Sequence, residues 1–131
     1  MVGIDTNVLV RFFMRDDELQ SRQAAALMDS FSAKEQGFVS FVVVAELVWV
    51  LQYVFQLQKS QVVSVLLKLA SMPAIRLENM AIFLHALQLC NNTSVDFVDC
   101  LISGVAIHAG CACTMTFDRK SAKVPGMKRI R

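Results

Sequence analysis

Charged residues are scarce in this chain of 131 residues: they make up 18% of it, while apolar residues make up 55%. This composition predicts one domain over residues 1–131, with more apolar surface than a core needs, and we expect the excess to cover a partner. Long uninterrupted apolar runs are also lacking, because Ser40, Glu46 and Gln52 interrupt the richest one, residues 38–55. We therefore expect a buried helix there and no membrane-spanning segment.

Several familiar catalytic and binding signatures are absent as well. The sequence contains no P-loop, no GxGxxG, no Ser–His–acid set and no Cys–His set. Its four cysteines show no zinc-like pairing with histidines, and Cys111 and Cys113 form a CxC that we place in a strand with both thiols on one face. We expect reduced, packed thiols. Together with Asp5, which follows Met1 too closely for a secretory signal, they predict a cytoplasmic protein.

What the sequence does contain is an alternation of short strands and helices. Apolar runs predict strands over residues 2–4, 38–39, 74–77, 112–116 and 128–130. Amphipathic or apolar stretches predict helices over residues 8–14, 18–32, 41–57, 59–71, 79–90 and 95–110. The alternation predicts an α/β fold, a three-layer α/β/α sandwich around a mainly parallel twisted sheet.

Five of the eleven acidic residues lie in apolar sequence: Asp5, Glu46, Asp96, Asp99 and Asp118. Two of them follow strands and three lie in the first two turns of helices, so the expected topology brings all five to one edge of the sheet. Helix capping is the simpler interpretation for Asp5 or Asp96 alone. It does not explain Glu46, because its helix is apolar nearly all round and an unpaired buried carboxylate is costly.

Carboxylates crowded together repel one another, and a divalent cation removes that repulsion. Oxygen-only ligands suit Mg²⁺ or Mn²⁺, so we expect one of these ions as cofactor and phosphoryl chemistry at the site. Six of the thirteen Lys and Arg residues lie in the last thirteen positions, and Arg11 and Arg15 follow the first acid. Such basic flanks suit a phosphodiester substrate, although a solvated basic tail is the simpler alternative.

Three segments carry a resemblance to a known family: IDTNVLVRF, DFVDCLIS and TFDRK, with the helix-borne Glu46 between the first two. Their order and spacing resemble the PIN-domain ribonucleases, and most closely the VapC toxins of VapBC toxin–antitoxin pairs. The resemblance runs from residue 2 to about residue 130. It implies an α/β/α sandwich, a Mg²⁺- or Mn²⁺-dependent endoribonuclease acting on RNA, a homodimer, and a co-encoded antitoxin whose C-terminal segment enters the active-site groove.

The same resemblance assigns roles to individual residues. The catalytic acids by position are Asp5, Glu46, Asp99 and Asp118. The metal ligands by position are Asp5, Asp99 and Asp118, with Asp96 as an auxiliary. Thr6, Asn7 and Thr116 match polar positions that orient carboxylates or water. We assign RNA contact to the neighbouring cations Arg11, Arg15, Arg119 and Lys120.

Three other functions stay open at this point. A metal-dependent phosphatase is disfavoured because the first strand ends in D-T-N and lacks a paired D-x-D. A receiver-like regulatory domain with a structural acidic metal site would require an Asp at the end of the middle strand, where the sequence has Leu77 and Glu78. The chain could also act mainly by binding, through the apolar helices at residues 41–57 and 59–71, to which we assign dimer and antitoxin contacts.

Overall fold

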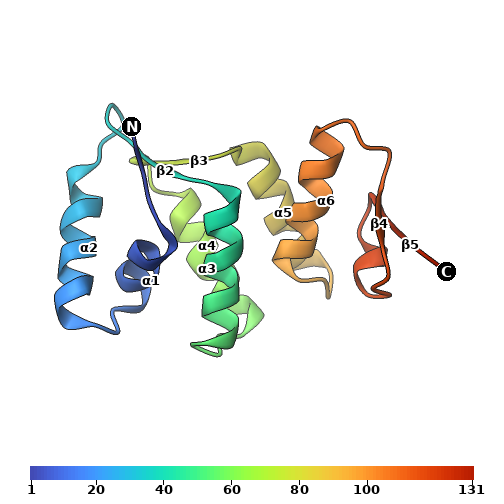
Figure 1. The fold of residues 1–131 in the computed structure, drawn as a ribbon, viewed down its shortest axis with the longest axis horizontal. Helices are drawn as coiled ribbons and strands as arrows, with labels where there is room; N and C mark the ends of the chain where they lie inside the picture. The colour runs from blue at the N-terminus through green and yellow to red at the C-terminus, as the bar shows by residue number, and fades with distance from the viewer. The chain divides into compact units, whose positions relative to one another are not determined.

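The computed structural model describes residues 1–131 and divides them into two compact units, Met1–Glu78 and Asn79–Arg131 (Figure 1). Each unit combines helices with parallel strands, which confirms the predicted α/β fold. None of the helices combines the length and the apolarity that crossing a membrane requires.

The first unit contains three strands and four helices. They follow in the order β1 (Val2–Gly3), α1 (Thr6–Met14), α2 (Glu18–Ser30), β2 (Gly37–Val39), α3 (Phe41–Tyr53), α4 (Lys59–Ala70) and β3 (Ile75–Leu77). The strands pair in the parallel order β1-β2-β3, with Gly37 opposite both Val2 and Ile75. Because parallel strands end at the same edge of a sheet, the segments that begin at Ile4, Ser40 and Glu78 leave from one side.

Close packing fixes the start of β2 beside the segment that carries Asp5. A Cβ atom on Gly37 would lie 2.5 Å from Ile4 Cδ1 and 2.8 Å from Phe31 Cε2, so a larger residue here would require these side chains to shift. The amide of Ile4 donates to the carbonyl of Phe38 at 2.9 Å, which extends the pairing of β1 with β2 by one residue. The chain therefore reaches Asp5 from a strand end that is fixed against β2.

Helix α3 starts at the same edge and is anchored there by two side chains. Ser40 Oγ accepts from the Val43 amide at 3.2 Å, as the sequence predicted, and Glu78 Oε1 accepts from the Phe41 amide at 2.9 Å. The inner face of α3 is fully buried at Val44, Leu47 and Leu51. Each such side chain contributes about 1.5–3 kcal/mol of hydrophobic stabilisation.

The second unit contains two long helices followed by a small sheet. Its elements are α5 (Met80–Asn92), α6 (Phe97–His108), β4 (Thr114–Thr116), the 3₁₀ turn η1 (Ser121–Lys123) and β5 (Met127–Arg129). Helices α5 and α6 pack together around Phe83 and Phe97, whose rings meet edge to face with centroids 5.4 Å apart. Strands β4 and β5 pair in parallel.

The prediction that Cys111 and Cys113 lie in a strand is wrong. The chain turns at Gly110, whose φ of +97° suits glycine, and β4 begins only at Thr114, where the amide bonds the Gly126 carbonyl at 2.7 Å. Cys111 and Cys113 are free thiols. Cys90 and Cys100 are buried as expected, whereas Cys111 is exposed.

Candidate functional site

Asp5 follows β1 and caps the first helix of the chain. Its extended backbone (φ −80°, ψ 159°) ends the strand segment, and its Oδ1 accepts from the Thr6 amide at 2.8 Å. The side chain is exposed, and its Oδ2 accepts none of the chain's hydrogen bonds. The N-terminus of α1 places a partial positive charge beside this carboxylate. Asp5 is therefore both a cap and a carboxylate with one oxygen open to a ligand.

Thr6 connects Asp5 to Glu46. Its hydroxyl donates to Glu46 Oε1 at 2.9 Å, while its own amide donates to Asp5, and the side chain is 5% exposed. The structure thus brings Asp5, Thr6 and Glu46 together within the first unit. Thr6 therefore contacts both carboxylates, and its orienting role in a functional site stays a prediction.

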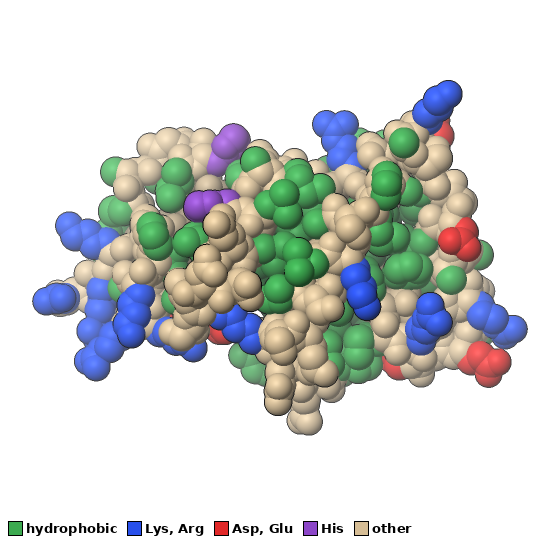
Figure 2. All heavy atoms as spheres, turned by 180° about the vertical axis from the view of Figure 1, so that it is seen from behind, with side chains coloured by type: hydrophobic (Ala, Val, Ile, Leu, Met, Phe, Trp, Pro, Cys, Tyr) green, Lys and Arg blue, Asp and Glu red, His purple; other side chains and the backbone are tan.

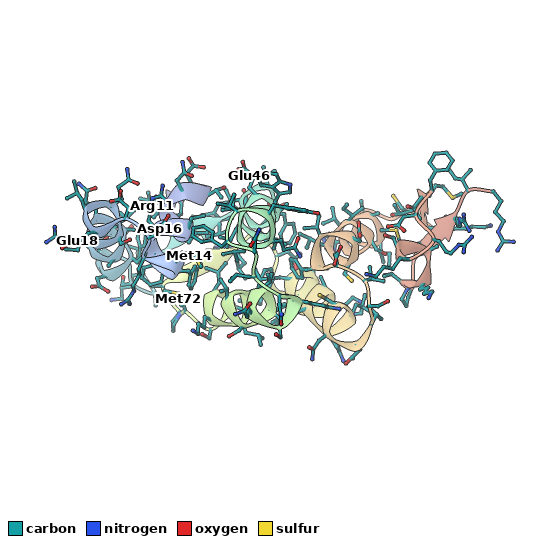
Figure 3. The ribbon with its side chains drawn as sticks, turned by 90° about the horizontal axis from the view of Figure 1, so that it is seen from below. Arg11, Met14, Asp16, Glu18, Glu46 and Met72 are labelled. Atoms are coloured by element: carbon teal, nitrogen blue, oxygen red, sulfur yellow. The ribbon has the colours of Figure 1, made fainter.

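The expectation that Glu46 is buried is wrong. Glu46 is exposed, because it lies on the outer face of α3, while the inner face buries Val44, Leu47 and Leu51 (Figure 3). Val42, Trp49 and Tyr53 share the outer face and are also exposed. The apolar residues all round α3 therefore do not desolvate Glu46, and its carboxylate is open to substrate or solvent.

In the second unit, Asp96 and Asp99 lie at the start of α6. Asp96 is the N-cap residue and is exposed, but its side chain makes no capping hydrogen bond, so the capping interpretation does not account for its carboxylate. Asp99 lies in the first turn and is half-buried. The two acids lie three positions apart, a spacing that puts them on one face of the helix.

Asp118 is held in a compact turn after β4. Its Oδ1 accepts from the Lys120 amide at 2.9 Å, its Oδ2 accepts from Ser121 Oγ at 2.8 Å, and its own amide donates to Thr116 Oγ1 at 3.0 Å. Thr116 therefore orients the backbone of Asp118 and not its carboxylate. Asp118 itself remains exposed.

The pKa values show that the acids of the second unit act on one another. Burial raises the pKa of Asp99 above 3.8; the negative charges of Asp96 and Asp118 raise it further, while a hydrogen bond from Ser121 and the charge of Lys120 oppose the rise. For Asp118, the hydrogen bond from Ser121 and the Lys120 amide lower the pKa. Burial and two negative neighbours thus favour the protonated form of Asp99.

Neither unit gathers three or more His, Cys, Asp or Glu side chains closely enough to enclose a metal ion by itself. Mg²⁺ does not require such a cage, because it is commonly bound by one or two carboxylates together with water and substrate phosphate. The acids in both units offer oxygen ligands only, and negative neighbours raise the pKa of Asp99. A divalent cation beside Asp99 would offset this repulsion, so the donor set fits a hard cation.

The cations assigned to RNA fall into two groups. Arg11 is already paired, since its Nη1 donates to both Asp16 oxygens at 2.9 and 3.1 Å and its Nε donates to Gln20 Oε1 at 2.7 Å (Figure 3). Arg15 and Arg119 are exposed and form no ion pair, and Lys120 lies beside Asp118. Figure 2 shows Lys and Arg side chains gathered at the C-terminal end of the second unit. RNA contact by these residues stays a prediction.

Two residues with a role in this geometry were missed from the sequence. Ser121 bonds Asp118 and lowers the pKa of both Asp99 and Asp118. Ser121 lies three residues after Asp118, a spacing typical of capping side chains. The sequence therefore contained a signal that could have pointed to Ser121. Glu78 follows β3 as Asp5 follows β1, and it caps α3 from the strand edge.

Comparison with known proteins identifies a family and solved structures of similar fold. A family model described as "PIN domain" matches residues 2–127, which include parts of both units. No curated protein matches the chain. A solved structure described as "Toxin-antitoxin complex from Klebsiella pneumoniae" is similar over 98% of this chain and 96% of that chain, with 18% identity and a TM-score of 0.38. A likeness at that level bears on neither activity nor partner.

Proposed function

The chain belongs to the PIN-domain family, whose members are typically nucleases that use divalent metal ions, and we propose that it is a Mg²⁺- or Mn²⁺-dependent endoribonuclease. The observation that carries the proposal is the group of acids in the second unit, where burial, and after it the charges of Asp96 and Asp118, raise the pKa of Asp99. Carboxylates that repel one another without a structural cation are typical of metal sites.

The proposed catalytic set consists of Asp5, Glu46, Asp99 and Asp118. By the sequence resemblance, Asp5 and Asp99 would hold the principal ion, with Asp118 and Asp96 in support. When bound, the cation polarises the phosphate and lowers the pKa of a water molecule. Asp5 offers its Oδ2, since Oδ1 is occupied by the Thr6 amide.

Glu46 and Ser121 have separate tasks in this mechanism. Thr6 occupies Glu46 Oε1, so Oε2 is the oxygen left to orient the attacking water and to accept its proton. The hydrogen bond from Ser121 Oγ lowers the pKa of Asp118 and fixes the orientation of its carboxylate. The exposed side chains of Asp5, Glu46 and Asp118 leave the reacting groups open to a large substrate.

Cleavage by the purified protein tests the activity and the site together. We expect RNA to be cut in Mg²⁺ or Mn²⁺, and cutting to stop in EDTA and to fall by at least about a hundredfold in Asp5→Asn. Asp29→Asn is the matched control, because Asp29 is an exposed acid on α2 with no hydrogen bond or ion pair. Wild-type activity in Asp5→Asn, or activity unaffected by EDTA, would overturn the proposal.

The biological role that we propose is that of a cytoplasmic toxin in a type II toxin–antitoxin pair, active as a homodimer and restrained by a co-encoded antitoxin. It rests on the sequence resemblance, and the exposed apolar side chains of α3 and α4, such as Trp49 and Leu67, are the surface that we assign to these contacts. Induced expression should arrest growth, expression of the neighbouring small open reading frame should relieve the arrest, and Asp5→Asn should not arrest growth. Arrest that does not depend on Asp5 would refute this role.

A further inference from the structure

An open hollow lies between α1 and α2, and we propose that it is a nucleobase subsite for single-stranded RNA in which Gln20 donates a hydrogen bond to the edge of the base. This inference rests on the proposed function, since it takes RNA as the substrate. The hollow has a volume of about 400 Å³, within the range of small-molecule sites. The residues that carry the argument are Asn7, Val8, Arg11, Gln20, Gln23 and Leu27.

The orientation of Gln20 is determined by its neighbours. Arg11 Nε is a donor and bonds Gln20 at 2.7 Å, so the oxygen of the amide must face Arg11 and its NH₂ group must point away. The Gln20 backbone is held as well, because its amide donates to Asp17 Oδ1 at 2.8 Å. Gln20 therefore presents two N–H donors to an occupant of the hollow, and these fit a carbonyl oxygen or ring nitrogen of a base.

Charge in the hollow favours a base over a phosphate group. The guanidinium of Arg11 is the one cation of the lining, and its charge is matched by Asp16 through two hydrogen bonds. No carboxylate lines the hollow. An uncharged, flat ligand with polar edges fits this environment, with Val8 and Leu27 against its face and the amides of Gln20 and Gln23 at its edge.

The position of the hollow suits a nucleotide near the cleaved bond. Asn7 lines it and lies two residues after Asp5, on the first turn of the same helix. RNA whose phosphate reaches Asp5 can therefore place a neighbouring base in the hollow. Most of the exposed lining is apolar, which suits the face of a base, and the donors of Gln20 distinguish a base from a purely apolar peptide anchor.

Binding of short oligoribonucleotides in EDTA tests the subsite without cleavage. The probes are a fluorescent single-stranded oligoribonucleotide and an abasic ribose-phosphate chain of the same length and charge. We expect Gln20→Leu, which keeps the volume and removes the donors, to weaken binding of the intact probe about three- to tenfold and to leave the abasic probe unchanged. Gln88→Leu is the control, because Gln88 is an exposed glutamine on α5 in the other unit.

The outcomes separate this inference from the proposed activity. Equal loss of both probes, or no loss of either, overturns the subsite. The subsite is also overturned if Gln20→Leu binds RNA normally but loses affinity for the co-encoded antitoxin, because the hollow would then be a protein-binding site. Metal-dependent cleavage with no effect of Gln20→Leu on binding refutes the subsite alone. Base-dependent binding without any cleavage supports the subsite and refutes the nuclease.

Discussion

Thr6 and Glu46, forty positions apart in the sequence, are joined by a hydrogen bond of 2.9 Å from Oγ1 to Oε1. The backbone amide of Thr6 also donates to Asp5 Oδ1 at 2.8 Å. A single buried residue therefore touches two of the proposed catalytic acids, one through its main chain and one through its side chain. The relative position of these two carboxylates depends on Thr6, and this relationship is open to a direct test.

Thr6→Val should separate the two contacts, because valine has nearly the same shape and no hydroxyl. The Asp5 cap depends on the main chain and persists, while Glu46 loses its donor. We expect RNA cleavage to fall about tenfold or more, in keeping with the loss of one hydrogen bond to a charged group. The rate of single-turnover cleavage measures the effect, with Thr6→Ser as the control that keeps the hydroxyl. Equal rates in the valine and serine variants would show that Thr6 does not position Glu46.

Ser121→Ala should change the ionisation of the acids in the second unit. Ser121 Oγ donates to Asp118 Oδ2 at 2.8 Å and is the main cause of the lowered pKa of Asp118. Without this donor, the pKa of Asp118 should rise toward 3.8, and that of Asp99 should rise further above it. Carboxyl ¹³C chemical shifts followed through a pH titration measure both values. Ser94→Ala, at an exposed serine before α6, should leave them unchanged.

The same substitution has a consequence for stability with a defined sign. An acid whose pKa is lowered by folding stabilises the fold above its ordinary pKa, and this contribution is lost as the pH falls through the lower, folded-state value. The free-energy difference between wild type and Ser121→Ala should therefore be largest above pH 3.8 and should shrink below it. Urea unfolding at several pH values gives the difference directly, and a constant difference would contradict the assignment.

Asp96→Asn should lower the pKa of Asp99. Burial is the first cause of the raised pKa of Asp99, and the charge of Asp96 is one of the two repulsive causes. Because a raised pKa favours folding at low pH, the wild type should lose stability as the pH rises through the folded-state pKa of Asp99, and the variant should lose less. An NMR titration of the Asp99 carboxyl checks the shift, with Asp29→Asn as the control. An unchanged pKa would mean that Asp96 does not act on Asp99.

Sequence patterns predicted the elements that carry the acids better than they predicted the surroundings of those acids. Asp5 and Asp118 follow strands, Ser40 caps α3, and Asp96 lies at the start of α6, all as expected. These features depend on local capping and strand-ending preferences, which a single sequence carries. The exposure of Glu46 was missed, because an apolar helix does not reveal which of its faces meets the core.

Long-range partners were the other gap in the sequence prediction. Thr6 with Glu46, and Glu78 with Phe41, are pairs that only the packing of the chain brings together. The position of Cys111 and Cys113 was misjudged because alternation continues through the turn at Gly110, and the strand begins only where Thr114 finds a partner in Gly126. Strand limits depend on pairing, which composition does not encode.

Trp49→Ala should weaken self-association more than it weakens the fold. Trp49 is 58% exposed on the outer face of α3, and its ring lies beside that of Tyr53 with centroids 5.4 Å apart and planes tilted by 37°. Exposed Trp and Tyr side chains are typical of residues that dominate binding energy, so we expect about a thirtyfold rise in the dimer dissociation constant. Thermal unfolding at a concentration where both proteins are monomeric should differ little, because the side chain is not part of the core. Sedimentation velocity measures the association, and Leu19→Ala, at a 59% exposed leucine on α2, is the matched control. If Leu19→Ala weakens the dimer as much as Trp49→Ala, apolar exposure in general and not the α3 face drives association; if neither does, α3 is not the dimer surface.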